Sequence, residues 1–253
     1  MENLKRLNTG VSVQKDEAQT VSPKLLRIGL IVSLIVIGFM LAGAAYVWFS
    51  GGNGQASAAV TAPSLVLEPG DTRSLYSIAP HQAEARFIIQ ETLVGNPKTV
   101  IGSTHEVAGE MLIDLDNPQN SVLGVIRVNV RTLETDNEFR NRALRGQILQ
   151  ADRPEFEFAE FTPTSLSGLP ESVTVGEAFT FQIMGSLRVH GVSRDVTFDA
   201  AVTPVSHTRI EGTVRTSIMY RDFGMNIPAA AGVANVSDDV RIEIDFAAQT
   251  TSE

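Results

Sequence analysis

VRTLETDNEFRNRALRGQILQADRPEFEFAEF, residues 130–161, decides the fold, because it has a helical pattern in a chain that otherwise alternates like strands beyond residue 70. Thr135 or Asp136 can cap a helix that begins near Asn137, since their side chains accept hydrogen bonds from free backbone N–H groups. Pro154 cannot continue a helix, so the helix ends before it. Four apolar residues recur at helical spacing and form a single stripe: Phe139, Ala143, Leu144 and Ile148. The segment therefore predicts one helix that packs on an apolar surface.

Strands are predicted on both sides of this helix, where hydrophobic and polar residues alternate between turn signals. The eight segments with this pattern are Arg86–Thr92, His105–Leu115, Val122–Arg131, Glu155–Phe161, Glu177–Val189, Asp195–Val202, Arg209–Met219 and Asp239–Ala247. Eight antiparallel strands can close into a barrel, which removes exposed sheet edges. We therefore expect a mainly β domain, an eight-stranded antiparallel barrel with one helix packed at it, although a two-sheet sandwich would alternate in the same way. The pattern leaves open whether the interior is filled or hollow.

The composition limits the classes of function. The chain has 253 residues, no Cys and a net charge of −9. Residues 1–27 hold five Lys/Arg and three Asp/Glu, a balance of +2, so the remainder carries −11. Nucleic acids and anionic membrane faces bind clustered Lys and Arg, so we expect neither as a partner of this acidic domain.

An apolar run of twenty-two residues, 28–49, follows a polar segment, 1–27, that we expect to be disordered. As a helix the run is about 33 Å long and matches a bilayer core. Lys24 and Arg27 precede it and the next cation is Arg73, which predicts a cytoplasmic N-terminus and an extracytoplasmic domain, periplasmic or at the cell surface. The alternative is a signal peptide cleaved after Ala58. Residues 50–71 have the composition of a flexible linker, residues 72–249 form the predicted barrel domain, and residues 250–253 form a short tail.

Separated motifs along residues 75–248 together resemble the YceI-like family. They are Tyr76, Ile78 and Phe87; Val107–Glu110; Thr135–Asn137 with Arg140, Arg142, Leu149, Pro154 and Phe158; Gly185–Val192 with Val196; Arg221–Met225; and Val236–Val240. The sequence departs from the family pattern at Ala79 and Gln82, where many members have Asp and His, and at Glu91, where a further His is common. Roles that those polar groups have in other members therefore do not transfer to this chain.

The resemblance implies an extracytoplasmic lipid-binding protein whose lipocalin-like barrel holds a long polyisoprenoid or quinone-precursor chain, without any other cofactor. The residues expected to line such a site are Phe87, Ile89, Ile126, Val128, Phe139, Phe156, Phe158, Phe181, Leu187 and Phe223. Filled core packing would need the same residue types. The rival hypothesis is therefore a solidly packed β domain without a lipid ligand, which would act as an interaction or stress-response module in the cell envelope.

Arginines on the predicted helix are the candidates for a lipid head group, because a guanidinium matches phosphate or carboxylate oxygens in a bidentate manner. Arg140, Arg142 and Arg145 could meet such a group, with Arg140 and Arg142 as the head-group candidates, although all three can instead form the solvated face of the helix or pair with Asp136, Glu138 and Asp152.

No enzyme is predicted. The four histidines are scattered without metal-ligand spacing, and no nucleophile or phosphate-binding motif is present in the sequence. We therefore expect no metal site and no catalytic residue, while the oligomeric state stays open.

Overall fold

The computed structural model describes residues 23–250 and divides between Ala44 and Ala45 into two compact units. Helix α1 (Pro23–Ser50) contains one segment, Leu26–Ser50, that is long and apolar enough to cross a membrane. The helix includes the predicted span but begins earlier, within the predicted tail. The rest of that tail, residues 1–22, and residues 251–253 lie outside the described part of the chain.

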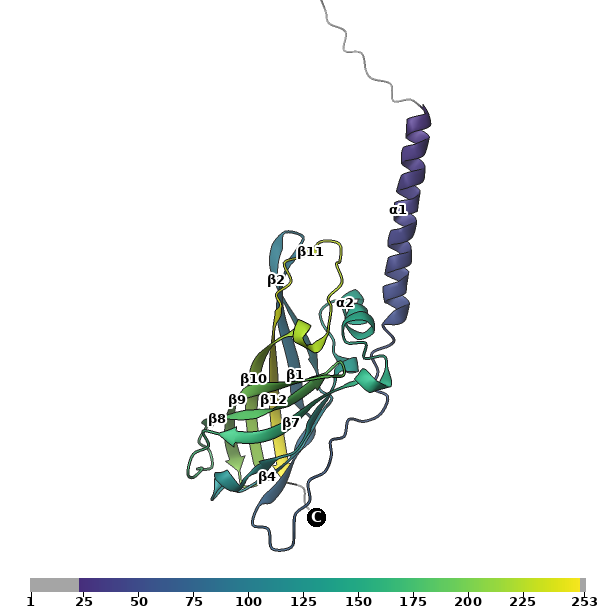
Figure 1. The fold of residues 1–253 in the computed structure, drawn as a ribbon. Helices are drawn as coiled ribbons and strands as arrows, with labels where there is room; N and C mark the ends of the chain where they lie inside the picture. Colours follow the sequence, from purple (N-terminus) through teal and green to yellow (C-terminus); the bar gives the residue numbers. More distant parts are fainter. Residues whose placement is uncertain (1–22, 251–253) are drawn as a thin grey trace, which may run out of the picture. The chain divides into compact units, whose positions relative to one another are not determined.

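The unit that follows Ala44 is built around one antiparallel sheet that curls into a β-barrel (Figure 1). Its strands are β1 (Ser74–Leu93), β2 (Asn96–Thr104), β3 (Val107–Ala108), β4 (Glu110–Ile113), β5 (Val122–Leu123), β6 (Ile126–Asn129), β7 (Phe158–Ser167), β8 (Phe179–Val189), β9 (Val192–Ser206), β10 (Arg209–Met219), β11 (Val233–Ala234) and β12 (Asp239–Thr250). The hydrogen-bonded order is β3-β6-β7-β8-β9-β10-β12-β1-β4-β5, and β2 and β11 also pair with β1.

Strand β1 lets the sheet curl because it has two sets of partners. Its first residues pair with β4, its last residues pair with β2, and β12 lies along its other edge. The register against β12 shifts between Ile78 and Ala83, which marks a bulge that bends the strand. The single sheet rules out the two-sheet sandwich.

The expected count of eight strands is not confirmed, because the sheet contains twelve. The predicted segment 105–115 is broken into β3 and β4, and the segment 122–131 into β5, β6 and the 3-10 turn η2 (Val130–Thr132). Strands β2 and β11 were not predicted. The predicted strand at Glu155 is wrong at its start: Pro154–Phe156 form a 3-10 turn, η4, and β7 begins only at Phe158. Further 3-10 turns are η1 (Pro118–Asn120) and η5 (Tyr220–Phe223).

The predicted helix is confirmed in position but is shorter and less regular. Helix α2 (Glu138–Ala143) continues into a π-helical turn, η3 (Leu144–Ile148). Asn137 caps α2, since its side-chain oxygen accepts a hydrogen bond from the Arg140 backbone N–H at 3.0 Å. The expected caps, Thr135 and Asp136, lie two residues and one residue before the observed cap. Thr135 instead accepts a hydrogen bond from the Asn137 backbone N–H.

Candidate functional site: an apolar cavity inside the barrel

The barrel encloses a cavity of about 520 Å³. Strands β1, β6, β7 and β12 supply part of its wall, α2 and η3 another part, and residues 225–236 a third. The four residues of the helical stripe, from Phe139 to Ile148, all lie on it. Ligand pockets typically measure roughly 300–1,000 Å³ and are lined by apolar side chains. The cavity has the size and the chemistry of a binding site for an apolar molecule.

A second, smaller void of about 110 Å³ adjoins the first. Four residues line both spaces: Ile126, Phe161, Phe198 and Ile244. Within this set, the rings of Phe161 and Phe198 meet edge to face with their centroids 4.9 Å apart. Gly185 makes room for this pair, because a Cβ at that position would lie 2.6 Å from the Phe161 ring. The aromatic pair therefore separates a large chamber from a small one.

Seven of the ten residues predicted to line a ligand site border these spaces. On the large cavity lie Phe87, Ile89, Ile126, Val128, Phe139 and Leu187, and on the small one Phe181, with Ile126 on both. Phe139 is 42% exposed, so the large cavity reaches the surface beside α2.

Three predicted residues lie elsewhere. Phe156 belongs to the η4 turn and packs on His190, with ring centroids 4.9 Å apart. Phe158 lies under the Arg127 guanidinium, 5.2 Å from its ring centroid. Phe223 is buried in the core and borders neither space. The late start of β7 explains the first two errors, because the 3-10 turn breaks the alternation assumed from Glu155 onward.

Sequence reasoning missed the wall contributed by η5 and the segment after it. The residues concerned are Tyr220, Met225, Ile227, Pro228, Ala230, Ala231, Val233 and Val236. They have neither helical nor strand periodicity, and the family motifs that include Met225 and Val236 gave no sign that these residues line a cavity. By contrast, Ile242 and Ile244 belong to a strictly alternating face of β12, and that alternation was a signal for an inward position.

The polar side chains on the large cavity are already paired. Arg140 donates to Glu91 at 2.8 Å and to Asp136 at 2.6 Å. The hydrogen bond from Lys98 to Asp136, 2.5 Å long, and the nearby Arg140 charge hold the pKa of Asp136 below its ordinary value. Arg86 donates to Asp245 and Glu84, which raises the pKa of its guanidinium. A head group that reached Arg140 would compete with two carboxylates.

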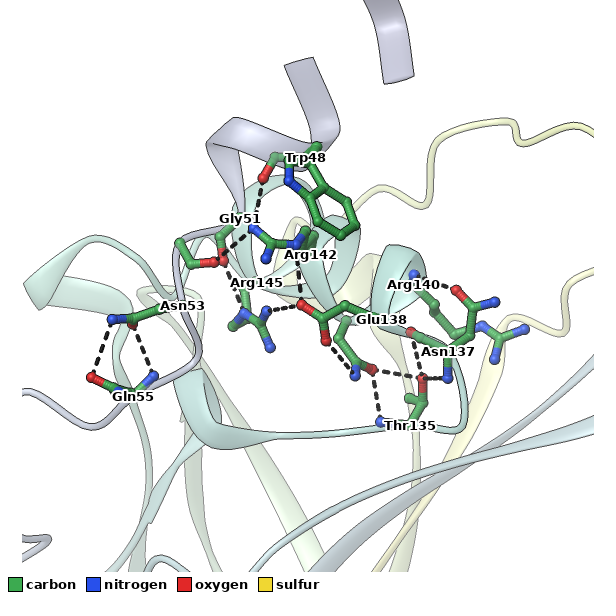
Figure 2. A network of polar contacts seen from close by, with 12 residues as sticks. Trp48, Gly51, Asn53, Gln55, Thr135, Asn137, Glu138, Arg140, Arg142 and Arg145 are labelled. Carbon is green, nitrogen blue, oxygen red and sulfur yellow. Dashed lines mark hydrogen bonds and ion pairs between the residues drawn. The ribbon is translucent and has the colours of Figure 1, made fainter. Parts of the chain in front are cut away.

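Of the three helix arginines considered for a head group, Arg140, Arg142 and Arg145, the structure brings only Arg140 to the cavity. Arg142 points to the other side of α2 and lies over the Trp48 ring, 3.9 Å from its centroid (Figure 2). It donates to the backbone oxygens of Trp48 and Gly52 and pairs with Glu138. Among residues 23–250, no group of three or more His, Asp or Glu side chains is placed to hold a metal ion.

Comparison with known proteins agrees with this architecture. The family model described as the YceI-like domain matches residues 76–248. The chain belongs to the YceI-like family. A sequence search of curated proteins finds no match.

Two solved structures with this YceI-like fold show how widely it is shared. A polyisoprenoid-binding domain from Saccharophagus degradans, implicated in plant cell wall breakdown, is 16% identical to this chain, with a TM-score of 0.52. The match covers 70% of this chain and 98% of that domain. BcnA of Burkholderia cenocepacia is 13% identical, with a TM-score of 0.54, and covers 67% of this chain and 98% of its own. At such low identities the similarity establishes the fold alone.

Proposed function

We propose that the domain holds the apolar chain of a lipid, of polyisoprenoid or quinone-precursor type, inside the barrel for storage, transport or protection. Helix α1 tethers the domain to the membrane on its extracytoplasmic side. The observation that carries the proposal is the apolar cavity of about 520 Å³, which opens beside α2. Its size counts against the rival hypothesis of a solidly packed domain. The proposal requires no catalytic residue and no other cofactor.

The energy for such binding comes from removing apolar surface from water. Each methylene group transferred into an apolar site contributes about 0.8 kcal/mol, so about ten buried groups supply about 8 kcal/mol before the entropic costs of association. The cavity wall offers little else, since Arg140 and Arg86 are already paired with carboxylates. We therefore expect selectivity for the length and shape of the chain rather than for a charged head group.

The orientation of the domain rests on charge. Lys24 and Arg27 precede the apolar segment and no Lys or Arg follows before Arg73. Because positive residues stay on the cytoplasmic side, the barrel is expected outside the cytoplasm. Protease digestion of intact cells, which should remove the barrel while cytoplasmic controls survive, tests this part of the proposal.

Binding is tested by filling the cavity. Ala159 lies on the cavity wall in β7, so Ala159→Trp places an indole in the space that the lipid would occupy. Thr162, on the same strand, is exposed, and Thr162→Trp is the matched control. Retention of a radiolabelled polyprenol by the purified full chain should fall at least about tenfold in Ala159→Trp, a change of about 1.4 kcal/mol, and stay unchanged in the control. Equal retention by both variants would show that the cavity is not the binding site.

A further inference from the structure

Residues 48–57, the end of α1 and the segment that follows it, are held against α2, its π-helical continuation η3 and the end of η4, although they lie outside the residues that match the family. Arg145, on the turn that continues α2, donates from Nε to the Gly51 carbonyl at 2.9 Å. Arg142 donates to the carbonyls of Trp48 at 2.7 Å and Gly52 at 3.2 Å (Figure 2). The predicted flexible linker therefore has, in its first part, specific partners in the barrel unit.

Glycines allow this contact to be close. A Cβ on Gly51 would lie 2.4 Å from the Arg142 carbonyl oxygen, and a Cβ on Gly146 would lie 2.8 Å from the Ser50 carbonyl oxygen. Neither distance is compatible with a side chain unless the backbone moves. The backbone of residues 50–51 thus packs directly on the helical segment, and the side chain of Arg145 beneath it is only 2% exposed.

Glu157 forms the second point of attachment. Its carboxylate accepts hydrogen bonds from the Ser57 backbone N–H at 2.9 Å and from the Ser57 hydroxyl at 2.6 Å. Asn129 and Arg131 complete its partners, at 2.9 and 3.1 Å. Burial disfavours the ionised carboxylate, but the hydrogen bonds from Ser57 and Asn129 and the charge of Arg131 outweigh it and lower the pKa of Glu157.

Cleavage after Ala58 would remove this whole arrangement. Arg145 would lose the Gly51 carbonyl and keep Glu138, and Glu157 would lose both hydrogen bonds from Ser57. Two buried charged side chains would thereby lose part of their hydrogen bonding, which is unfavourable in a folded domain. The contacts favour a chain in which residues 48–57 are retained.

We propose that residues 48–57 form a strap that is a permanent part of the domain and holds α2, one wall of the cavity, in place. Trp48 is the kind of residue that prefers the membrane–water interface, and its ring lies on Arg142 of α2. The strap does not rest on the proposed function.

Hydrogen–deuterium exchange of the full chain in lipid nanodiscs tests the strap. Gly51→Val adds a side chain where α2 leaves no room. We expect the amides of residues 48–57 and 138–148 to exchange about tenfold faster than in the wild type, which is the effect of losing about one hydrogen bond to a charged group. Gln55→Ala is the control, because among residues 23–250 the side chain of Gln55 hydrogen-bonds only to Asn53, which is itself in the strap. Trp48→Ala, which removes the ring without adding bulk, should give the same direction of change if Gly51→Val fails to fold.

Any of three results would overturn the strap. The intact mass of the mature protein could show that its first residue follows Ala58, or the amides of wild-type residues 48–57 could exchange as fast as those of a free peptide. Alternatively, Gly51→Val and Trp48→Ala could exchange at the same rates as the Gln55→Ala control. These readouts do not depend on a ligand. Absence of bound lipid would therefore refute the proposed function alone.

Discussion

Removing the aromatic partition between the two chambers should lengthen the lipid that the barrel holds. Phe161 and Phe198 are both buried and line both spaces, so Phe198→Ala joins voids of about 520 and 110 Å³. A buried Phe→Ala change costs about 3–5 kcal/mol of stability. Because Phe198 borders empty space on two sides, it has fewer packing partners to lose, and we expect the loss to lie near the lower value.

The assay combines urea unfolding of the purified full chain with mass spectrometry of its extracted lipids. The distribution of chain lengths should shift upward in Phe198→Ala. Phe223→Ala is the matched control, since Phe223 is 1% exposed and borders neither chamber, so it should lose about 4–5 kcal/mol without altering the lipid. If the chain-length distribution is unchanged in Phe198→Ala, or shifts equally in Phe198→Ala and Phe223→Ala, the aromatic pair does not limit the length of the bound lipid.

Three further predictions concern charged groups. The pKa of Glu157 is lower in the folded protein than in the unfolded chain, where it is about 4.3. Its ionised carboxylate therefore stabilises the fold above that pH, and this stabilisation is lost as the pH falls through the folded pKa. Glu157→Gln should flatten the dependence of the unfolding free energy on pH over this acidic range, as measured by urea unfolding. Arg140→Ala leaves the buried Glu91 without its ion pair and should lower the free energy of unfolding by about 1–3 kcal/mol in the same assay. If the same variant binds lipids with different head groups in the same order as the wild type, Arg140 does not recognise the head group. NMR titration should give Asp71 a pKa of about 2, rising toward about 3.9 in Arg73→Ala, because hydrogen bonds from Arg73 hold it down; an unshifted value would contradict that cause.

The strands with strict alternation could be predicted from the sequence because one face of each is apolar. Strand β2 could not: Pro97 and Gly102 interrupt its sequence, and both are features of a turn when read alone. In the structure Gly102 faces the Phe87 ring, and a Cβ there would lie 2.2 Å from it. The glycine thus serves a contact across strands β1 and β2, which a single sequence does not reveal.

The site was predictable where periodicity governs it and unpredictable elsewhere. The stripe from Phe139 to Ile148 lies on the cavity as expected, because a short helix has only one face to bury. Residues 225–236 form a wall without a repeating pattern, and the η4 turn changes the direction of Phe156. The volume of the cavity is a property of how all walls pack together, so no local pattern specifies it.

The most direct test is the mass spectrum of an organic extract from the full chain purified without added lipid, compared with Ala159→Trp prepared in the same way. A hollow barrel that binds a lipid should yield one long apolar chain in about equimolar amount from the wild type and little from the variant. No extracted hydrocarbon from the wild type, or equal amounts from both proteins, would contradict lipid binding in the cavity.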